Sequence, residues 1–267
     1  MKQLKIFSTA CLLVVMAGCS TVPLTGRRQL SLVSDSELQQ ASTQAYRQFL
    51  SDPSTKVVNS GSDLQRVRTV GNRIATAINR YLKQNGYGDQ YNYNYEFNLI
   101  QSKDQNAWCM PGGKVAVFTG LLPITQNDAG LATVMSHEIA HAIAQHAAER
   151  YSQAAAAQGL GGVLGAATGG ASAGTQQVLG TLYGLGGQLA LLNYSRKQES
   201  EADHLGLIFM AMAGYNPDNA LSFWQRMAAQ KSGGAPPEFL STHPSDATRI
   251  ADIQKRLPEA RKYYTAR

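Results

Sequence analysis

The sequence predicts a mostly helical α+β fold with one small β-sheet, on three observations. Most of the 267 residues fall in segments whose apolar side chains recur every three or four positions, the spacing of one helix face. Residues 91–99 instead alternate apolar and polar side chains, and a second strand-like segment follows a tight turn. Apolar residues make up 43% of the chain and charged residues only 16%, so a buried core is available and wholesale disorder is excluded.

The first 18 residues predict a secretory signal peptide. Two lysines precede an uncharged apolar stretch at 10–17 that is too short to span a bilayer. The residues Met-Ala-Gly before Cys19 resemble a bacterial lipobox, although leucine is usual where this chain has methionine. Cys19 would then be the lipidated first residue of the mature protein, and Ser20 after it suggests sorting to the outer membrane. A plain signal peptide and an N-terminal membrane anchor are the alternatives.

From Cys19 onward, the elements are expected in the following order. Residues 19–34 are rich in Ser, Thr and Pro and predict a lipidated tether, and residues 35–267 form a single domain. Helices are expected from about 36, then over 63–82, 128–150, 188–213, 217–227 and from 245 or 246 to 257, and strands over 91–99 and 115–119. Residues 154–187 are rich in Gly and Ala and predict a flexible insert, because each glycine disfavours a helix by about 1 kcal/mol relative to alanine.

Charge and cysteine content exclude two classes of protein. The formal net charge is +6, and it falls to +4 when a signal peptide with two lysines is removed. No basic stripe interleaved with aromatic residues is present, so a nucleic-acid partner is not expected. Three cysteines cannot build a disulfide scaffold. If Cys19 is lipidated, Cys109 is the lone thiol of the mature chain.

The residues His137-Glu138-Ile139-Ala140-His141 form an HExxH motif on a predicted helix. Histidines four residues apart lie on one helix face, so both imidazoles can bind the same metal ion. Glu138 is placed to reach water at the metal rather than the metal itself. A helix with two histidines that bind no metal is the alternative.

A third protein ligand must come from another part of the chain. His146 lies five residues after His141, whereas the HExxHxxGxxH class of zinc proteases needs the sixth position and a glycine, so that class is excluded. His146 is expected to support a ligand or to be an ordinary helix residue. Glu199 is the better candidate, because two histidines and one carboxylate leave a fourth position open for water, as in catalytic zinc sites. Asp203 shares its helix face, while Glu201 points elsewhere; a solvated acidic helix face is the alternative.

HExxH followed by Glu199-Ser200-Glu201-Ala202-Asp203 resembles metallopeptidase family 48, over roughly residues 104–249. The family includes heat-shock and CAAX prenyl proteases, and this chain resembles its periplasmic lipoprotein branch. The resemblance implies a zincin-like fold, with the small sheet packed near the HExxH helix, and one zinc ion per chain. It implies that Glu199 is the third ligand, and that Asp203 and Arg249 support the ligands from outside, with Asp203 orienting a histidine. Asn106 resembles the family's asparagine at the edge of the substrate cleft.

His243 precedes a proline in a predicted loop. By the resemblance it faces the zinc site, where it either stabilises the oxyanion or takes the fourth metal position and holds the enzyme inactive. An ordinary loop histidine is the alternative. The strand that contains Val115 and Val117 is expected to offer a free edge, to which an extended substrate adds as a further strand.

These observations predict a lipid-anchored zinc endopeptidase of the bacterial envelope, an outer-membrane lipoprotein that faces the periplasm. Glu138 would take a proton from the attacking water and pass it to the leaving amine. The expected substrates are polypeptides, above all misfolded or outer-membrane proteins, and Cys19 is the expected membrane contact. One alternative is a chaperone-like factor that binds outer-membrane assembly proteins and rarely uses its protease. Another is a zinc amidase of cell-wall peptides, whose usual ligand sets differ from this one.

Overall fold

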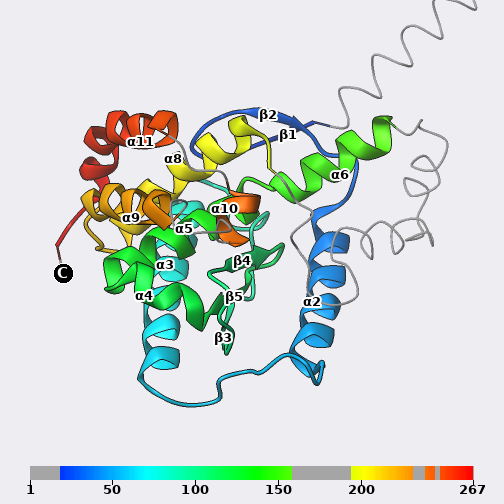
Figure 1. Ribbon diagram of the computed structural model, residues 1–267. Coiled ribbons are helices and arrows are strands. Elements are labelled where there is room, and N and C mark those ends of the chain that lie inside the picture. Colours follow the sequence, from blue (N-terminus) through cyan, green and yellow to red (C-terminus); the bar gives the residue numbers. More distant parts are fainter. Residues whose placement is uncertain (1–18, 158–193, 231–237, 244–246, 267) are drawn as a thin grey trace, which may run out of the picture.

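The computed structural model describes residues 19–157, 194–230, 238–243 and 247–266 (Figure 1). It confirms the mostly helical α+β fold. The helices are α2 (Asp35–Ser51), α3 (Ser62–Gln84), α4 (Leu122–Thr125), α5 (Asp128–Ile143), α6 (His146–Ala157), α8 (Arg196–Met212), α9 (Asp218–Ala229), α10 (Glu238–Thr242) and α11 (Ala247–Ala260). The strands are β1 (Cys19–Thr21), β2 (Arg28–Leu30), β3 (Glu96–Ile100), β4 (Ala107–Met110) and β5 (Lys114–Phe118). The predicted signal peptide and nearly all of the Gly/Ala-rich insert lie outside the described residues.

The three-stranded sheet has the order β3-β5-β4, with β5 parallel to β3 and antiparallel to β4. The prediction that β5 offers a free edge is therefore wrong, because β5 is paired on both sides. Its side chains Val115 and Val117 are fully buried. The edge next to α5 belongs to β4, which the sequence analysis did not predict because its four residues show no alternation of polar and apolar side chains.

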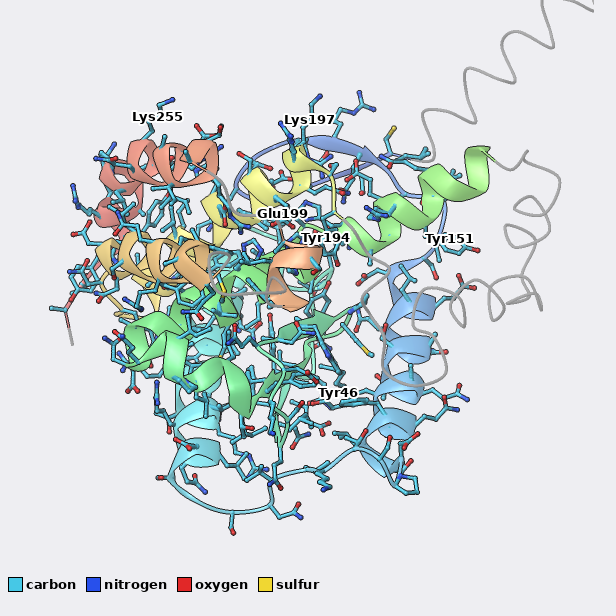
Figure 2. All side chains as sticks on the ribbon, in the orientation of Figure 1. Tyr46, Tyr151, Tyr194, Lys197, Glu199 and Lys255 are labelled. Carbon is cyan, nitrogen blue, oxygen red and sulfur yellow. The ribbon has the colours of Figure 1, made fainter. Side chains whose placement is uncertain are left out.

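Helices cover both faces of this sheet. On one face, α2 contributes Leu38 and Tyr46 to a small core, and Tyr46 donates a hydrogen bond of 2.7 Å to the backbone oxygen of Val115 (Figure 2). On the other face lies the main core, to which α3, α5 and α8 contribute. Its helices occupy the side of the sheet opposite α2 (Figure 1).

The predicted strand over residues 91–99 is shorter in the structure, where only its end is part of β3. Tyr91 and Tyr93 are buried, and their rings meet at a centroid distance of 5.9 Å. A local backbone bond from Tyr93 N to Tyr91 O replaces strand pairing at this point. The alternation of apolar residues here therefore reflects an aromatic cluster rather than a strand.

The N-terminal segment is folded against the domain, which corrects the prediction of a tether at 19–34. β1 and β2 form an antiparallel pair in which Cys19 lies opposite Leu30. Val22 is fully buried and Gln29 nearly so. Cys19 itself is exposed at the start of β1.

The helix predicted over residues 128–150 is two helices in the structure. Asn127 caps α5 by accepting a hydrogen bond from Gly130 N, and α5 is buried from residue 130 to its end. Gln145 then adopts a left-handed conformation with φ 53°, and α6 starts at the next residue in a new direction. Among the described residues, no helix has both the length and the apolar character of a membrane span.

α5 and α8 pack so closely that a glycine is required between them. A Cβ atom at Gly206 would lie 3.1 Å from both the Cα and the backbone N of His137. The neighbouring atoms belong to a buried helix backbone and cannot rotate away. Gly206 therefore sets the distance between the helix that carries HExxH and the helix that carries Glu199.

We expect Gly206→Ala to destabilise the protein by about 1–3 kcal/mol, the usual cost of overpacking a core. In an unobstructed helix the same change stabilises by roughly 0.5–1 kcal/mol, so the sign of the effect tests the close contact. Chemical denaturation measures it, with Lys197→Ala on the exposed start of α8 as the control that stays near wild type. A stabilised Gly206→Ala variant would contradict the packing described here.

Candidate metal centre

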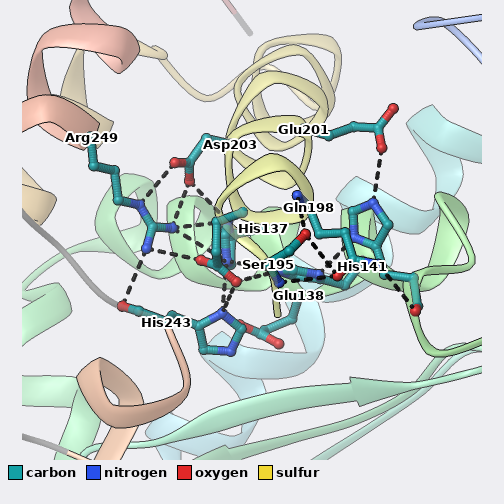
Figure 3. A network of polar contacts seen from close by, with 11 residues as sticks. His137, Glu138, His141, Ser195, Gln198, Glu201, Asp203, His243 and Arg249 are labelled. Carbon is teal, nitrogen blue, oxygen red and sulfur yellow. Dashed lines mark hydrogen bonds and ion pairs between the residues drawn. The ribbon is translucent and has the colours of Figure 1, made fainter. Parts of the chain in front are cut away.

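Four buried side chains from separate parts of the chain converge on one point (Figure 3). α5 supplies His137 and His141, α8 supplies Glu199, and His243 follows directly after α10. Each offers one ligand atom, and the four atoms all lie within 4.8 Å of one another. Among the described residues this is the one group of this kind.

The ring nitrogens of the three histidines point toward one another. His137 Nε2 lies 3.2 Å from His141 Nε2 and 3.2 Å from His243 Nδ1. Glu199 Oε1 lies 2.8 Å from His243 Nδ1 and 3.3 Å from His141 Nε2. All four side chains are nearly inaccessible to solvent.

These residues fit a zinc ion. Imidazole nitrogen and carboxylate oxygen are donors that zinc prefers, and sites of this size take four of them. Burial lowers the pKa of His141 well below its usual value, which keeps the ring in the neutral form that binds metal. Glu199 Oε2 is buried without a hydrogen bond, although it lies 3.0 Å from the Arg249 guanidinium.

Asp203 and Arg249 support the ligands from the side of His137. Asp203 Oδ1 lies 3.0 Å from His137 Nδ1, which leaves Nε2 free to face the cluster. Arg249 is buried and donates two hydrogen bonds to Asp203, of 2.8 and 2.7 Å. The guanidinium also lies 3.5 Å above the ring of Trp224 and donates to the backbone oxygen of His243. One arginine therefore links both helix-borne acids to the His243 segment.

Glu138 lies beside the cluster without belonging to it. Its Oε1 atom is buried without a hydrogen bond and lies 3.5 Å from His243 Nε2. Burial raises the pKa of Glu138 to about 7. A carboxyl group with a pKa in this range can take up and release a proton near neutral pH.

His146 and Glu201 form a second support, on the side of His141. Support of a ligand was one of the two roles expected for His146, whereas Glu201 was expected only to point elsewhere. His146 Nδ1 lies 2.8 Å from His141 Nδ1, and His146 Nε2 lies 2.9 Å from Glu201 Oε2. Burial tends to raise the pKa of Glu201, but its bonds to His146, Thr25 and Arg27 lower it to about 2. Glu201 does point away from the ligand cluster, as predicted, but it is buried and hydrogen-bonded to His146, Thr25 and Arg27.

The break between α5 and α6 makes the contact between His141 and His146 possible. In a continuous helix, residues five apart lie about 140° apart around the axis, so the two rings would face different directions. The left-handed Gln145 turns the chain so that His146 faces back toward His141. Positive φ is uncommon for glutamine, and nothing in the residue pattern indicated it.

Tyr194 is a second residue that the sequence analysis did not single out. Its ring stacks on His141 at a centroid distance of 3.9 Å, and it lies 5.7 Å from the ring of His243. Aromatic stacking holds an imidazole in one plane. No metal-binding motif used above includes Tyr194. Its place just before the start of α8 is the only feature of the sequence that could have indicated it.

The three predicted cleft residues do not join the cluster. Val115 and Val117 lie inside the sheet, as described above. Asn106 precedes β4, where its side chain accepts a hydrogen bond of 2.8 Å from Ala107 N. It therefore lies at the edge of the sheet that packs against α5, rather than among the ligand atoms.

Comparison with known proteins matches this chain to one family model, that of Peptidase family M48, over residues 65–257. The mitochondrial metalloendopeptidase OMA1 of Schizosaccharomyces pombe is 33% identical over 240 residues, which are 90% of this chain and 66% of that protein. OMA1 of Saccharomyces cerevisiae is 40% identical over 164 residues, which are 60% of this chain and 45% of that protein. The beta-barrel assembly-enhancing protease of Escherichia coli is 31% identical over 173 residues, which are 62% of this chain and 35% of that protein. The chain thus spans between about a third and two thirds of the length of these relatives.

Proposed function

Because the chain belongs to peptidase family M48, we propose that it hydrolyses peptide bonds within polypeptides, with zinc as its cofactor and Glu138 as its general base. The observation that carries this proposal is the buried cluster of three histidines and one glutamate, with an unpartnered Glu138 oxygen beside it. The family match over residues 65–257 confirms the predicted membership of this family.

His137, His141 and Glu199 are the residues that would hold the zinc ion. They come from two helices packed against each other at Gly206, which places their donor atoms close together. When bound, zinc supplies a Lewis acid that polarises a peptide carbonyl and makes water a stronger acid. Asp203 keeps His137 in the orientation that turns Nε2 toward the cluster.

Glu138 is the residue that would move the proton. It would accept a proton from the attacking water and deliver it to the nitrogen of the leaving peptide. Its raised pKa, caused first by burial, suits both steps, because a stronger acid would hold the first proton poorly. The lack of a hydrogen bond at Oε1 leaves that atom available to water.

The outer edge of β4 is the part of the sheet to which an extended substrate would add. Phe118 N donates to Asn106 O, and antiparallel backbone bonds alternate, so Ala107 and Cys109 direct their backbone groups away from β5. β4 also packs against α5, which carries the proposed base. The outer edge of β4 is thus proposed for substrate binding in place of β5, the strand expected from the sequence. Asn106, which precedes β4, keeps its proposed role at the cleft.

His243 is proposed to restrain the enzyme. Its Nδ1 atom lies within the ligand cluster, so it can take the fourth position that water needs for hydrolysis. The Arg249 contact with the backbone oxygen of His243 holds the ring there. Displacement of α10 and His243 would open the fourth ligand position to water.

We further propose that the protein acts in the bacterial envelope, anchored through a lipid on Cys19. The lipobox-like residues before Cys19 and its exposure at the start of β1 support this location. The relatives named for β-barrel assembly favour outer-membrane proteins as substrates or partners, whereas the OMA1 relatives are mitochondrial.

Glu138→Gln should abolish cleavage of an unfolded protein such as casein while zinc content stays near one ion per chain. The substitution keeps the shape of the side chain and removes the base, and loss of a general base costs about 10²–10⁴-fold. Proteolysis and zinc content are measured on the same preparation. Glu259→Gln, an exposed acid, is the control expected to keep wild-type activity. Cleavage by Glu138→Gln at the wild-type rate would contradict the mechanism.

His243→Ala should raise basal proteolysis without loss of zinc, because it vacates the fourth ligand position. His204→Ala, which removes a histidine paired with Glu259 at the surface, should leave the rate unchanged. A fall in turnover of about 10²–10³-fold would instead identify His243 as an oxyanion donor. An unchanged rate with unchanged zinc would make it an ordinary loop histidine.

Cys19→Ser should remove incorporation of a palmitate analogue and release the protein from membranes in a bacterial host. Several acyl chains anchor a protein stably, whereas none remain in this variant. Metabolic labelling and membrane fractionation measure the two effects, and Cys109→Ser is the matched control that keeps its label. Label retained on Cys19→Ser would refute the proposed anchor.

A further inference from the structure

A chain of hydrogen bonds, buried from Glu201 inward, connects the N-terminal strand pair to the metal ligand His141. Arg27 Nε donates to Glu201 Oε2 at 2.6 Å, and the same oxygen lies 2.9 Å from His146 Nε2. His146 Nδ1 in turn lies 2.8 Å from His141 Nδ1. His146 is fully buried, and Glu201 is 7% exposed. None of these contacts takes part in the peptide hydrolysis proposed above.

Metal binding requires one arrangement of protons along this chain. His141 directs Nε2 to the ligand cluster, so its proton is on Nδ1 and is donated to His146 Nδ1. His146 Nδ1 must then accept, which puts the ring proton of His146 on Nε2 and directs it to Glu201. A carboxylate can only accept a hydrogen bond, so Glu201 favours this arrangement when the His146 ring is neutral.

Arg27 holds Glu201 in the position that this arrangement needs. Its two terminal nitrogens bind Glu149 at 2.7 and 3.0 Å while Nε binds Glu201, so one guanidinium bridges two carboxylates. Thr25 donates a further bond of 2.6 Å to Glu201 Oε1. Without Arg27, these two largely buried acids would have no positive charge between them.

We propose that His146 and Glu201 are positioning residues that fix the tautomer of the zinc ligand His141, and that Arg27 keeps Glu201 in place for this role. The N-terminal strand pair is thereby part of the support of the metal site. The inference rests on the proposed function only in taking His141 as a zinc ligand, and it does not require peptide cleavage.

The test measures the zinc dissociation constant of the full chain by competition with a chromophoric chelator. Glu201→Gln is the sharpest variant, because an amide can also donate and so allows the proton arrangement in which His141 Nε2 is protonated and cannot bind metal. We expect the zinc dissociation constant to rise by about 10–100-fold, as for other losses of a partner behind a metal ligand. Arg27→Met should shift it in the same direction.

Two matched controls separate this role from a general loss of ion pairs. Glu259→Gln removes the acid from the pair His204–Glu259, whose distance of 2.8 Å is close to that of His146–Glu201. Arg261→Met removes another arginine that binds a carboxylate through two nitrogens, that of Asp218. Both should keep wild-type zinc affinity. Arg27→Lys keeps the positive charge but has a single nitrogen and cannot bridge the two carboxylates. It replaces Arg27→Met in the test if that variant does not fold.

A ring-nitrogen NMR spectrum of the zinc-bound protein provides a readout that a merely structural role would not change. Wild type should carry a proton on His141 Nδ1, and Glu201→Gln should show a mixture of tautomers or loss of the metal-bound signal. A double variant of Arg27 and Glu201 should weaken zinc binding by less than the product of the two single effects, because both act through one contact. Unchanged zinc affinity and an unchanged His141 signal in Glu201→Gln would overturn the inference. Zinc binding that responds as expected in a protein that cleaves nothing would overturn the proposed function alone.

Discussion

The close contact of α5 with α8 is the constraint on which the metal site depends. Gly206 brings the α8 backbone against His137, and Asp203 and Glu199 lie about one and two turns earlier on the same face of α8. The distance between two helix backbones therefore sets the distances between ligand atoms. A site built on packed helices needs little rearrangement to receive a metal ion, and small changes in that packing reach the chemistry directly.

Each helix histidine is supported from behind by an acid and an arginine. On one side, His137 contacts Asp203, which is held by Arg249. On the other side, His141 contacts an intervening histidine, whose acid Glu201 is held by Arg27. The arginines also balance the negative charge of the buried carboxylates, because an unpaired buried charge would cost several kcal/mol. Each arginine thus gives two buried carboxylates a positive partner, Arg249 on the side of His137 and Arg27 on the side of His141.

A helical period predicts the ligands and the acid that lie on the helices, whereas His243 and Arg249 were expected only from the family resemblance. His137 and His141 are four residues apart, as are Glu199 and Asp203, so a helix face predicts each pair. α3 and α9 begin within one residue of expectation, whereas α8 begins at Arg196 instead of near residue 188. The misses arise where a tertiary contact overrides a local pattern. A left-handed glutamine divides one predicted helix into two and places His146 against His141, the first of the two roles expected for it. The N-terminal segment is held by partners more than a hundred residues away, such as Glu149, and no local sequence pattern indicates such partners.

The strand pair at the N-terminus has a mechanical consequence. Cys19 and Leu30 are opposite each other at its open end, and Val22 N binds Arg27 O next to the turn. A load applied at residue 19 would therefore act on the cross-strand pairs one after another, as in the opening of a zipper, rather than shear them together. Cys19–Leu30 would part first and Thr21–Arg28 third, before any tension reaches the Arg27 guanidinium. The strand pair can therefore open pair by pair while the contacts of Arg27 behind His141 are still intact.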